Sequence, residues 1–210
     1  MNMILCSMLG YLIGNINAAY IISKLNGFDI RERGSGNAGA SNVTIVIGKR
    51  AGAFAALFDI FKAVTAASLG ASLFAEIKFA KILAGSSCIL GHIFPVFMRF
   101  HGGKGLACLA GVILSFDPEI FCFMLLAEII IGFSLDYICV VPITGSAVFT
   151  VIYAFFTGDF TGTMLLAFVS LIILVKHIEN LQRIQNGTEA HISFLWNKDG
   201  ELERIKKNGQ

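Results

Sequence analysis

Charged side chains are scarce in this sequence, where Asp, Glu, Lys and Arg make up only 14% of the 210 residues. Soluble domains usually carry about 25% charged residues, so a large soluble domain is excluded. The sequence has no basic face and no nucleic-acid-binding motif, and we expect no nucleic-acid partner. Hydrophobic residues make up 56%, and the mean hydropathy is +0.76. These values are typical of a polytopic membrane protein.

Metal-binding and redox patterns are also missing. No two of the five cysteines have the spacing of a zinc site or a redox pair, and the four histidines lack zinc spacing as well. We therefore predict no metal site. The cysteines all lie in apolar stretches, where we expect them to be small residues of the membrane core: Cys6, Cys88, Cys108, Cys122 and Cys139.

Long apolar segments dominate what is present. A membrane-spanning helix needs about 20 mostly apolar residues, and polar breaks separate several such segments. Asn15 and Asn17 are polar within the first of them and should face other helices. Residues 1–190 are predicted to form one transmembrane domain, and residues 191–210 a short polar tail. We predict an all-α fold with seven transmembrane helices, at residues 3–23, 51–75, 79–98, 105–116, 119–134, 137–156 and 160–176.

The distribution of basic residues predicts the orientation in the membrane. Placing the first polar loop (residues 24–50), the 99–104 loop and the chain from residue 176 onward on one side puts 13 of the 16 Lys and Arg residues there. Basic residues are concentrated in cytoplasmic loops, so we expect this side to be cytoplasmic. With seven helices, the N-terminus then lies outside the cell and the C-terminus in the cytoplasm.

Residues 31–42 form the first of three polar segments in this apolar chain. Their glycines allow positive φ values and a close approach of the backbone to a ligand. Successive N–H groups in such a loop can bind an anion, and Ser35, Asn37 and Asn42 add neutral hydrogen-bonding groups. A flexible loop without a ligand is the alternative.

Residues 101–105, His-Gly-Gly-Lys-Gly, form the second polar segment at the start of a predicted helix. The N–H groups and the dipole of a helix N-terminus attract anions, and Lys104 adds a positive charge. The spacing is not that of a Walker A loop. A tight turn with a lysine that extends to the membrane surface is the alternative.

The third polar segment begins where the last predicted helix leaves the membrane. His177, Asn180 and Arg183 recur every three residues there and so share a helical face. A histidine titrates near neutral pH and can transfer a proton; a polar helix end at the membrane surface is the alternative. Within the second predicted helix, Asp59 and Lys62 also share a face, where charges are either paired or functional. The three polar segments together indicate a site for a phosphate-bearing substrate at the cytoplasmic membrane surface.

Four motifs extend this interpretation, and they occur in order between residues 10 and 189. They are Gly34-Ser-Gly-Asn-Ala-Gly-Ala-Ser-Asn42, Gly91-His-Ile-Phe-Pro95, Phe100-His-Gly-Gly-Lys-Gly105, and His177-Ile-Glu-Asn180 followed by Arg183 and Gly187-Thr-Glu189. In sequence and spacing they resemble the acyl-phosphate-dependent glycerol-3-phosphate acyltransferases, the PlsY family.

The resemblance implies a multi-pass enzyme of the bacterial inner membrane, with its active site facing the cytoplasm. Such an enzyme transfers an acyl group from acyl-phosphate to the 1-hydroxyl of glycerol 3-phosphate, giving lysophosphatidate and phosphate without a cofactor. The acyl chain would lie among the apolar helices and membrane lipid. The implied catalytic residues are His177, Lys104 and Asn180, and the implied substrate-binding residues are Ser35, Gly36, Asn37, Asn42, Arg50, Gly102, Gly103 and Arg183.

In this scheme residues 35–37 bind the acyl-phosphate head group, and Lys104 binds glycerol 3-phosphate together with Arg50 or Arg183. Either His177 or a phosphate oxygen of the substrate takes the hydroxyl proton. The alternatives are a non-catalytic relative, which senses lipid or phosphate or is a partner of lipid-synthesis enzymes, and a transporter. A transporter should carry its charges near the membrane midplane, whereas here the polar clusters lie at one face.

The chain departs from the family pattern between the fifth and sixth predicted helices. The family tends to have an arginine and serines there, whereas residues 134–142 of this chain contain Asp136 and no basic residue. A carboxylate close to phosphate groups would repel them. We therefore expect Asp136 to turn away to a cation such as Arg99 or Arg183.

Overall fold

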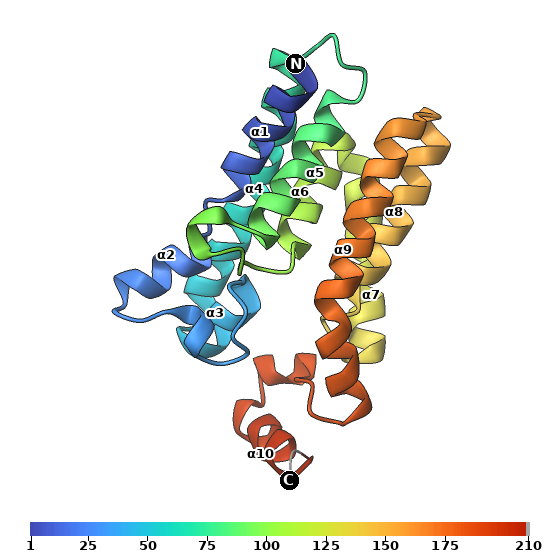
Figure 1. Ribbon diagram of the computed structural model, residues 1–210. Coiled ribbons are helices and arrows are strands. Elements are labelled where there is room, and N and C mark those ends of the chain that lie inside the picture. The colour runs from blue at the N-terminus through green and yellow to red at the C-terminus, as the bar shows by residue number, and fades with distance from the viewer. Residues whose placement is uncertain (209–210) are drawn as a thin grey trace.

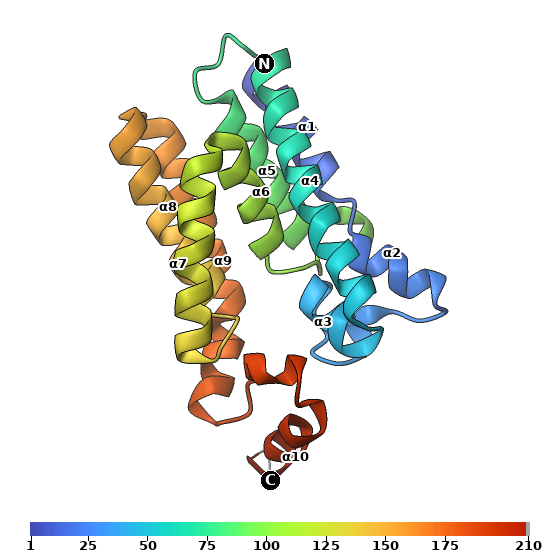
Figure 2. The same ribbon diagram turned by 180° about the vertical axis from the view of Figure 1, so that it is seen from behind.

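The structure is a computed structural model that describes residues 1–208. Every regular element in this range is a helix, which confirms the predicted all-α class (Figures 1 and 2). The α-helices are α1 (Asn2–Gly14), α2 (Ala18–Leu25), α3 (Ala40–Val46), α4 (Lys49–Leu73), α5 (Ala80–Ile93), α6 (Leu106–Phe116), α7 (Pro118–Leu135), α8 (Val141–Thr157), α9 (Phe160–Gln185) and α10 (Lys198–Asn208). Short 3-10 helices are η1 (Ile30–Glu32), η2 (Val96–Met98) and η3 (Ile192–Leu195).

Several of these helices have the properties of membrane spans. Large apolar side chains such as Phe123 and Phe155 are 75% and 85% exposed, which suits a surface in contact with lipid. Two apolar helices, α6 and α8, are shorter but lie where spans were predicted. Within residues 1–208, five segments are long and apolar enough to cross a membrane: Asn2–Leu25, Lys49–Leu73, Ala80–Met98, Pro118–Leu135 and Phe160–Gln185.

The first predicted helix is interrupted, so its prediction as one continuous helix is wrong. α1 ends at Gly14 and α2 begins at Ala18, pointing in a different direction (Figure 1). The side chain of Asn17 accepts a hydrogen bond from the backbone N–H of Tyr20 at 2.8 Å and thereby caps α2. Both asparagines of this break are buried, as predicted, because their side chains bond to distant backbone groups.

Other helix boundaries also differ from the prediction, and α5 ends at Ile93 instead of residue 98. α8 begins at Val141 instead of residue 137, because Asp136 adopts a left-handed conformation with φ 60° and ends α7. α9 continues past residue 176 to Gln185. The third polar segment therefore begins on a continuous helix, which fixes the relative positions of its side chains.

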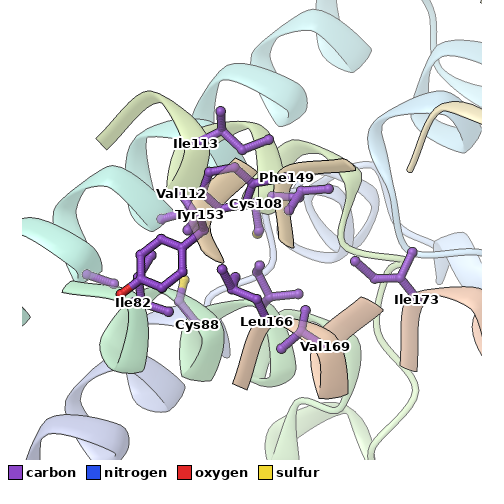
Figure 3. Close-up of a cluster of buried hydrophobic side chains, with 14 of the residues drawn as sticks. Ile82, Cys88, Cys108, Val112, Ile113, Phe149, Tyr153, Leu166, Val169 and Ile173 are labelled. Carbon is purple, nitrogen blue, oxygen red and sulfur yellow. The ribbon is translucent and has the colours of Figure 1, made fainter. Parts of the chain in front are cut away.

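The helices pack in two groups around a shared core. α1, α4, α5 and α6 form one group, and α7, α8 and α9 form the other (Figures 1 and 2). α5 contacts α9, and α6 contacts both α7 and α8. Phe149 of α8 and Leu166 of α9 belong to the same buried cluster as Cys88 of α5 and Val112 of α6 (Figure 3). The two groups are therefore joined by apolar packing along the bundle.

Four of the five cysteines are buried, as predicted from their apolar surroundings. Cys122 is the exception, because it is exposed on α7. It lies within Pro118–Leu135, one of the segments long and apolar enough to cross a membrane.

α1 and α5 approach each other more closely than large side chains would permit. A Cβ atom added at Gly10 would overlap the carbonyl oxygen of Ala84, and one added at Gly91 would overlap that of Tyr11. Small residues let membrane helices approach to backbone contact in this way. This contact places the end of α5, which holds the second polar loop, against the break between α1 and α2.

We expect Gly10→Ala to destabilise the protein, although alanine favours a helix by about 1 kcal/mol over glycine. Overpacking of a filled interface costs about 1–3 kcal/mol, and here the obstacle is backbone, which cannot move aside. Gly132→Ala is a matched control, since its Cβ would meet only side-chain methyl groups at 3.3 and 3.5 Å. The thermal-unfolding midpoint in detergent should fall for Gly10→Ala and change less for Gly132→Ala; equal midpoints would contradict the backbone contact.

Candidate active site

The three polar segments meet at one cavity of about 520 Å³. The first segment contributes Arg31, Glu32 and residues 35–37, with Asp29 just before it; the second contributes residues 101–104, and α9 contributes Val175, Lys176 and Glu179. Segments separated by more than half of the chain thus line one space. This confirms that they converge, as their chemistry suggested.

Asn42 holds the first polar loop in shape from within. Its side-chain oxygen accepts a hydrogen bond from the Ser35 N–H at 2.9 Å. Its side-chain nitrogen donates to the backbone carbonyls of Ile30, Arg33 and Asn37 at 3.1, 2.9 and 3.0 Å. The side chain is 1% exposed and every polar atom in it is engaged. Asn42 therefore positions the residues that line the cavity and does not line it.

Ser35 and Asn37 differ from Asn42, because their side chains are available to a ligand. Both line the cavity. Within residues 1–208, neither side chain has a hydrogen-bond partner. A hydroxyl and an amide held by a fixed backbone loop can donate to phosphate oxygens.

Arg31 connects the first polar loop to the segment before the second. Its guanidinium donates to the Asp29 carboxylate at 2.8 and 3.0 Å and to the Met98 carbonyl at 2.7 Å. Hydrogen bonds from Arg31 lower the pKa of Asp29 well below its usual range, and Asp29 in turn raises the pKa of Arg31. The charge of Arg31 is therefore largely neutralised by its own neighbour.

The second polar loop lies directly on the end of α5. The N–H groups of Gly102 and Gly103 donate to the carbonyls of Ile93 and His92, both at 3.1 Å. A Cβ atom at Gly102 would overlap the His92 carbonyl oxygen, and one at Gly103 would overlap the His92 ring. Glycine is required at both positions for this close approach. The two glycines line the cavity, but their N–H groups are already used.

A buried ion pair lies beneath this loop and joins three helices. The Lys62 ammonium is 2.7 Å from the Asp59 carboxylate and 3.0 Å from Nδ1 of His92. It also donates to the carbonyls of Gly14 and Ile16 at 3.2 and 2.7 Å, which the break between α1 and α2 leaves without helical partners. Of the two alternatives left open for Asp59 and Lys62, paired or functional, the structure shows them paired.

The same cluster contains groups that could bind a metal ion. Ligand atoms of Asp59, His92 and Cys108 lie within 4.8 Å of one another. The ammonium of Lys62 already contacts two of these residues and supplies the positive charge that a metal would bring. A second cation would be repelled, so the donor set fits an ion pair and does not fit a metal site.

Lys104 is linked to α9 through a chain of hydrogen bonds. Its ammonium donates to the side-chain oxygen of Asn180. The side-chain nitrogen of Asn180 donates to Glu189 at 2.5 Å, and Nε of Arg183 donates to the other Glu189 oxygen at 2.7 Å. Burial, the largest effect, and the nearby charge of Arg183 lower the pKa of Lys104. Glu189, which the sequence analysis gave no role, is thus central to this network.

His177 is buried on the same face of α9, one turn before Asn180. Its Nδ1 lies 2.7 Å from the backbone carbonyl of Ile173. A carbonyl oxygen can only accept, so Nδ1 carries the proton and Nε2 is the acceptor of the ring. His177 does not line the cavity but lies beside the Lys104 network.

Two predicted substrate-binding arginines do not line the cavity. Arg50 is exposed near the start of α4, and Arg183 is held by Glu189. Lys176 lines the cavity instead, with its ammonium 4.7 Å from the centre of the Phe94 ring. The sequence analysis missed this lysine, although its position next to His177 was a signal.

Comparisons with known proteins agree with these features. Residues 4–187 match the family model described as glycerol-3-phosphate acyltransferase. A Bacillus subtilis glycerol-3-phosphate acyltransferase is 35% identical over 188 residues, which cover 89% of this chain and 96% of that protein. A Listeria monocytogenes protein of the same name is 36% identical over 198 residues, covering 92% and 98%.

The fold is also similar to two crystal structures of PlsY (YgiH), an integral membrane glycerol 3-phosphate acyltransferase. The glycerol 3-phosphate form has a TM-score of 0.85 at 29% identity and covers 93% of this chain and 98% of the other. The lysophosphatidic acid form has a TM-score of 0.81 at 28% identity and covers 98% and 100%.

We expect Asn42→Asp to be nearly as destabilising as Asn42→Ala. Aspartate keeps the acceptor for Ser35 N–H but cannot donate to the three carbonyls. Those of Ile30 and Arg33 still accept from backbone N–H groups, whereas the Asn37 carbonyl loses its donor, and an unsatisfied buried group costs about 1–3 kcal/mol. Asn26→Asp is the control, because Asn26 makes one side-chain hydrogen bond in an exposed position. Thermal unfolding of the purified proteins measures both effects. A stable Asn42→Asp variant would contradict the role of its side-chain nitrogen.

Proposed function

Since this chain belongs to the glycerol-3-phosphate acyltransferase family, we propose that it transfers an acyl group from acyl-phosphate to the 1-hydroxyl of glycerol 3-phosphate. Besides family membership, the residues that line the cavity support this activity. The cavity combines neutral donors at Ser35 and Asn37 with the cation of Lys104, whose ammonium is bonded to a neutral amide. These donors and this cation suit phosphate-bearing substrates. The lining also contains the carboxylates of Asp29, Glu32 and Glu179, of which Asp29 is paired with Arg31.

The reaction needs positioning more than activation. In acyl-phosphate, the phosphate is already a good leaving group. The substrate hydroxyl oxygen attacks the acyl carbon, a new C–O ester bond forms, and the bond from that carbon to the phosphate oxygen breaks. The products are lysophosphatidate and inorganic phosphate. Holding both substrates in contact can contribute about 7–11 kcal/mol to lowering the barrier.

The lining residues divide between the two substrates. Ser35, Gly36 and Asn37 would bind the acyl-phosphate head group. Lys104 would bind the phosphate of glycerol 3-phosphate, and Lys176 is better placed than Arg50 to add the second cation, because it lines the cavity. The acyl chain would extend among the apolar helices into the membrane.

The hydroxyl proton has two candidate acceptors. One is Nε2 of His177, which is the acceptor nitrogen when Nδ1 donates to Ile173. The other is a phosphate oxygen of the substrate, which is basic and adjacent to the hydroxyl. In either case Asn180 keeps Lys104 in place by accepting from its ammonium.

The proposal includes the number of membrane spans and the orientation of the chain in the membrane. Seven spans would place the N-terminus outside and the C-terminus in the cytoplasm, with the site at the cytoplasmic face of a bacterial inner membrane. Two observations support it. The N- and C-termini lie at opposite ends of the bundle (Figures 1 and 2), and the basic residues are concentrated on the side of the cavity.

We expect purified protein to convert palmitoyl-phosphate and glycerol 3-phosphate into lysophosphatidate. Lys104→Ala should lower turnover by at least ~100-fold, or about 2.7 kcal/mol of barrier, because an uncompensated cation near two phosphates is lost. Lys78→Ala is the matched control, since Lys78 is exposed in the connection between α4 and α5. A wild-type protein that makes no lysophosphatidate would favour the non-catalytic alternative, and an active Lys104→Ala would remove Lys104 from the site.

The topology can be tested by labelling single cysteines. Cys122 is exposed and must first be replaced by serine. Ser35→Cys and Lys78→Cys, both in exposed positions, should then react from opposite sides of the membrane. We expect an impermeant reagent added from the periplasm to label the cysteine at 78 and not the one at 35. Labelling of both positions from the periplasm would contradict the seven-span topology.

A further inference from the structure

The chain beyond α9 folds back onto the loop that carries Glu189. The guanidinium of Arg204, in α10, donates to the backbone carbonyls of Gly187 and Glu189 at 2.6 and 2.5 Å. Asn208 donates to the Gly187 carbonyl as well, at 2.8 Å. The match to the family model ends at residue 187, so these contacts come from a segment outside that match.

Glu201 completes the attachment of α10. Its carboxylate is 6% exposed and accepts hydrogen bonds from Arg204 at 2.9 and 3.2 Å and from the backbone N–H of His191 at 3.1 Å. Burial opposes its ionisation, but the hydrogen bonds from Arg204 and His191 outweigh burial and lower the pKa of Glu201 to about 2. The ion pair of Glu201 with Arg204 is therefore fully charged at neutral pH.

The segment that departs from the family pattern is the other contact of the tail. One carboxylate oxygen of Asp136 accepts from the N–H groups of Ile192 and Ser193 at 3.0 and 3.4 Å, and Tyr137 OH lies 3.1 Å from Nε2 of His191. Asp136 is not among the residues that line the cavity, and its partners are in the tail. The expectation that it would pair with Arg99 or Arg183 is wrong.

These contacts lead back to the cavity through Glu189. Its backbone carbonyl is held by Arg204, and its side chain holds Asn180 and Arg183. Asn180 is the hydrogen-bond partner of Lys104. A shift of the Glu189 backbone would therefore move the partner of the lysine that lines the cavity.

We propose that Arg204 and Glu201 are positioning residues for the glycerol 3-phosphate side of the site, and that they act through Glu189 on Asn180 and Lys104. The inference rests on the proposed function, because it assigns Lys104 to glycerol 3-phosphate. It gives the C-terminal helix a role in substrate binding, and it explains an acidic residue at position 136. A tail that only stabilises the fold would lower the amount of active protein without changing the affinity for substrate.

The test compares the steady-state kinetics of Arg204→Ala with those of the wild type in the full-length protein. We expect KM for glycerol 3-phosphate to rise about tenfold, since small displacements of positioned groups have effects of this order, while KM for acyl-phosphate stays within about twofold. Arg204→Lys should give an intermediate KM, because an ammonium cannot bond both carbonyls with a planar fork. Lys206→Ala is the matched control, an exposed cation on the same helix.

A double-mutant cycle tests the route of the effect. Once Glu189→Ala has removed the side chain that holds Asn180, adding Arg204→Ala should change KM for glycerol 3-phosphate little, because coupled residues are non-additive. Fully additive effects, or an Arg204→Ala variant with wild-type KM and only a lower thermal-unfolding midpoint, would overturn the inference. A wild-type protein without acyltransferase activity would instead overturn the proposed function, which keeps the two failures distinct.

Discussion

The buried ammonium of Lys62 is the interaction on which the arrangement of the site depends. A charge inside a membrane protein is costly unless it is paired and hydrogen-bonded. Asp59 supplies the countercharge, and Gly14 and Ile16 supply carbonyls that exist as free acceptors only because the first helix is interrupted. The contact with His92 extends the same constraint to α5 and so to the second polar loop. The Lys62 ammonium therefore holds the break between α1 and α2, helix α4 and helix α5 in fixed positions relative to one another.

Both polar loops use backbone N–H groups to hold themselves in place. The N–H of Ser35 is taken by Asn42, and that of Gly103 is taken by the carbonyl of His92. Gly102 and Gly103 serve close packing, whereas Gly34 and Gly36 adopt the positive φ values that the sequence analysis expected, 60° and 72°. In the proposed function, ligand recognition would depend on side chains that line the cavity, such as Asn37 and Lys104. Rigid support of this kind suits a reaction that depends on positioning.

The sequence predicted the features that depend on local pattern. Apolar segments predicted the helices, and three-residue spacing predicted that His177 and Asn180 share a face. Features that depend on distant partners were missed. The break at Asn15–Asn17 depends on carbonyl and amide groups of Ala38 and Val96, and the role of Glu189 depends on how the chain folds back after α9. Neither the helix break nor the role of Glu189 can be predicted from the residues next to it in the sequence.

Whether a cationic side chain contacts a carboxylate distinguishes the cations that stabilise the fold from those available to bind substrate. Arg31 and Arg183 each contact a carboxylate within 3 Å, so little of their charge remains for a ligand. Lys104 is bonded to the neutral amide of Asn180, and burial lowers its pKa because nothing adjacent fully compensates its charge. A bound phosphate would supply that compensation and favour the charged form of Lys104. The same desolvation that lowers the pKa of Lys104 therefore strengthens the attraction of its ammonium for an anionic substrate.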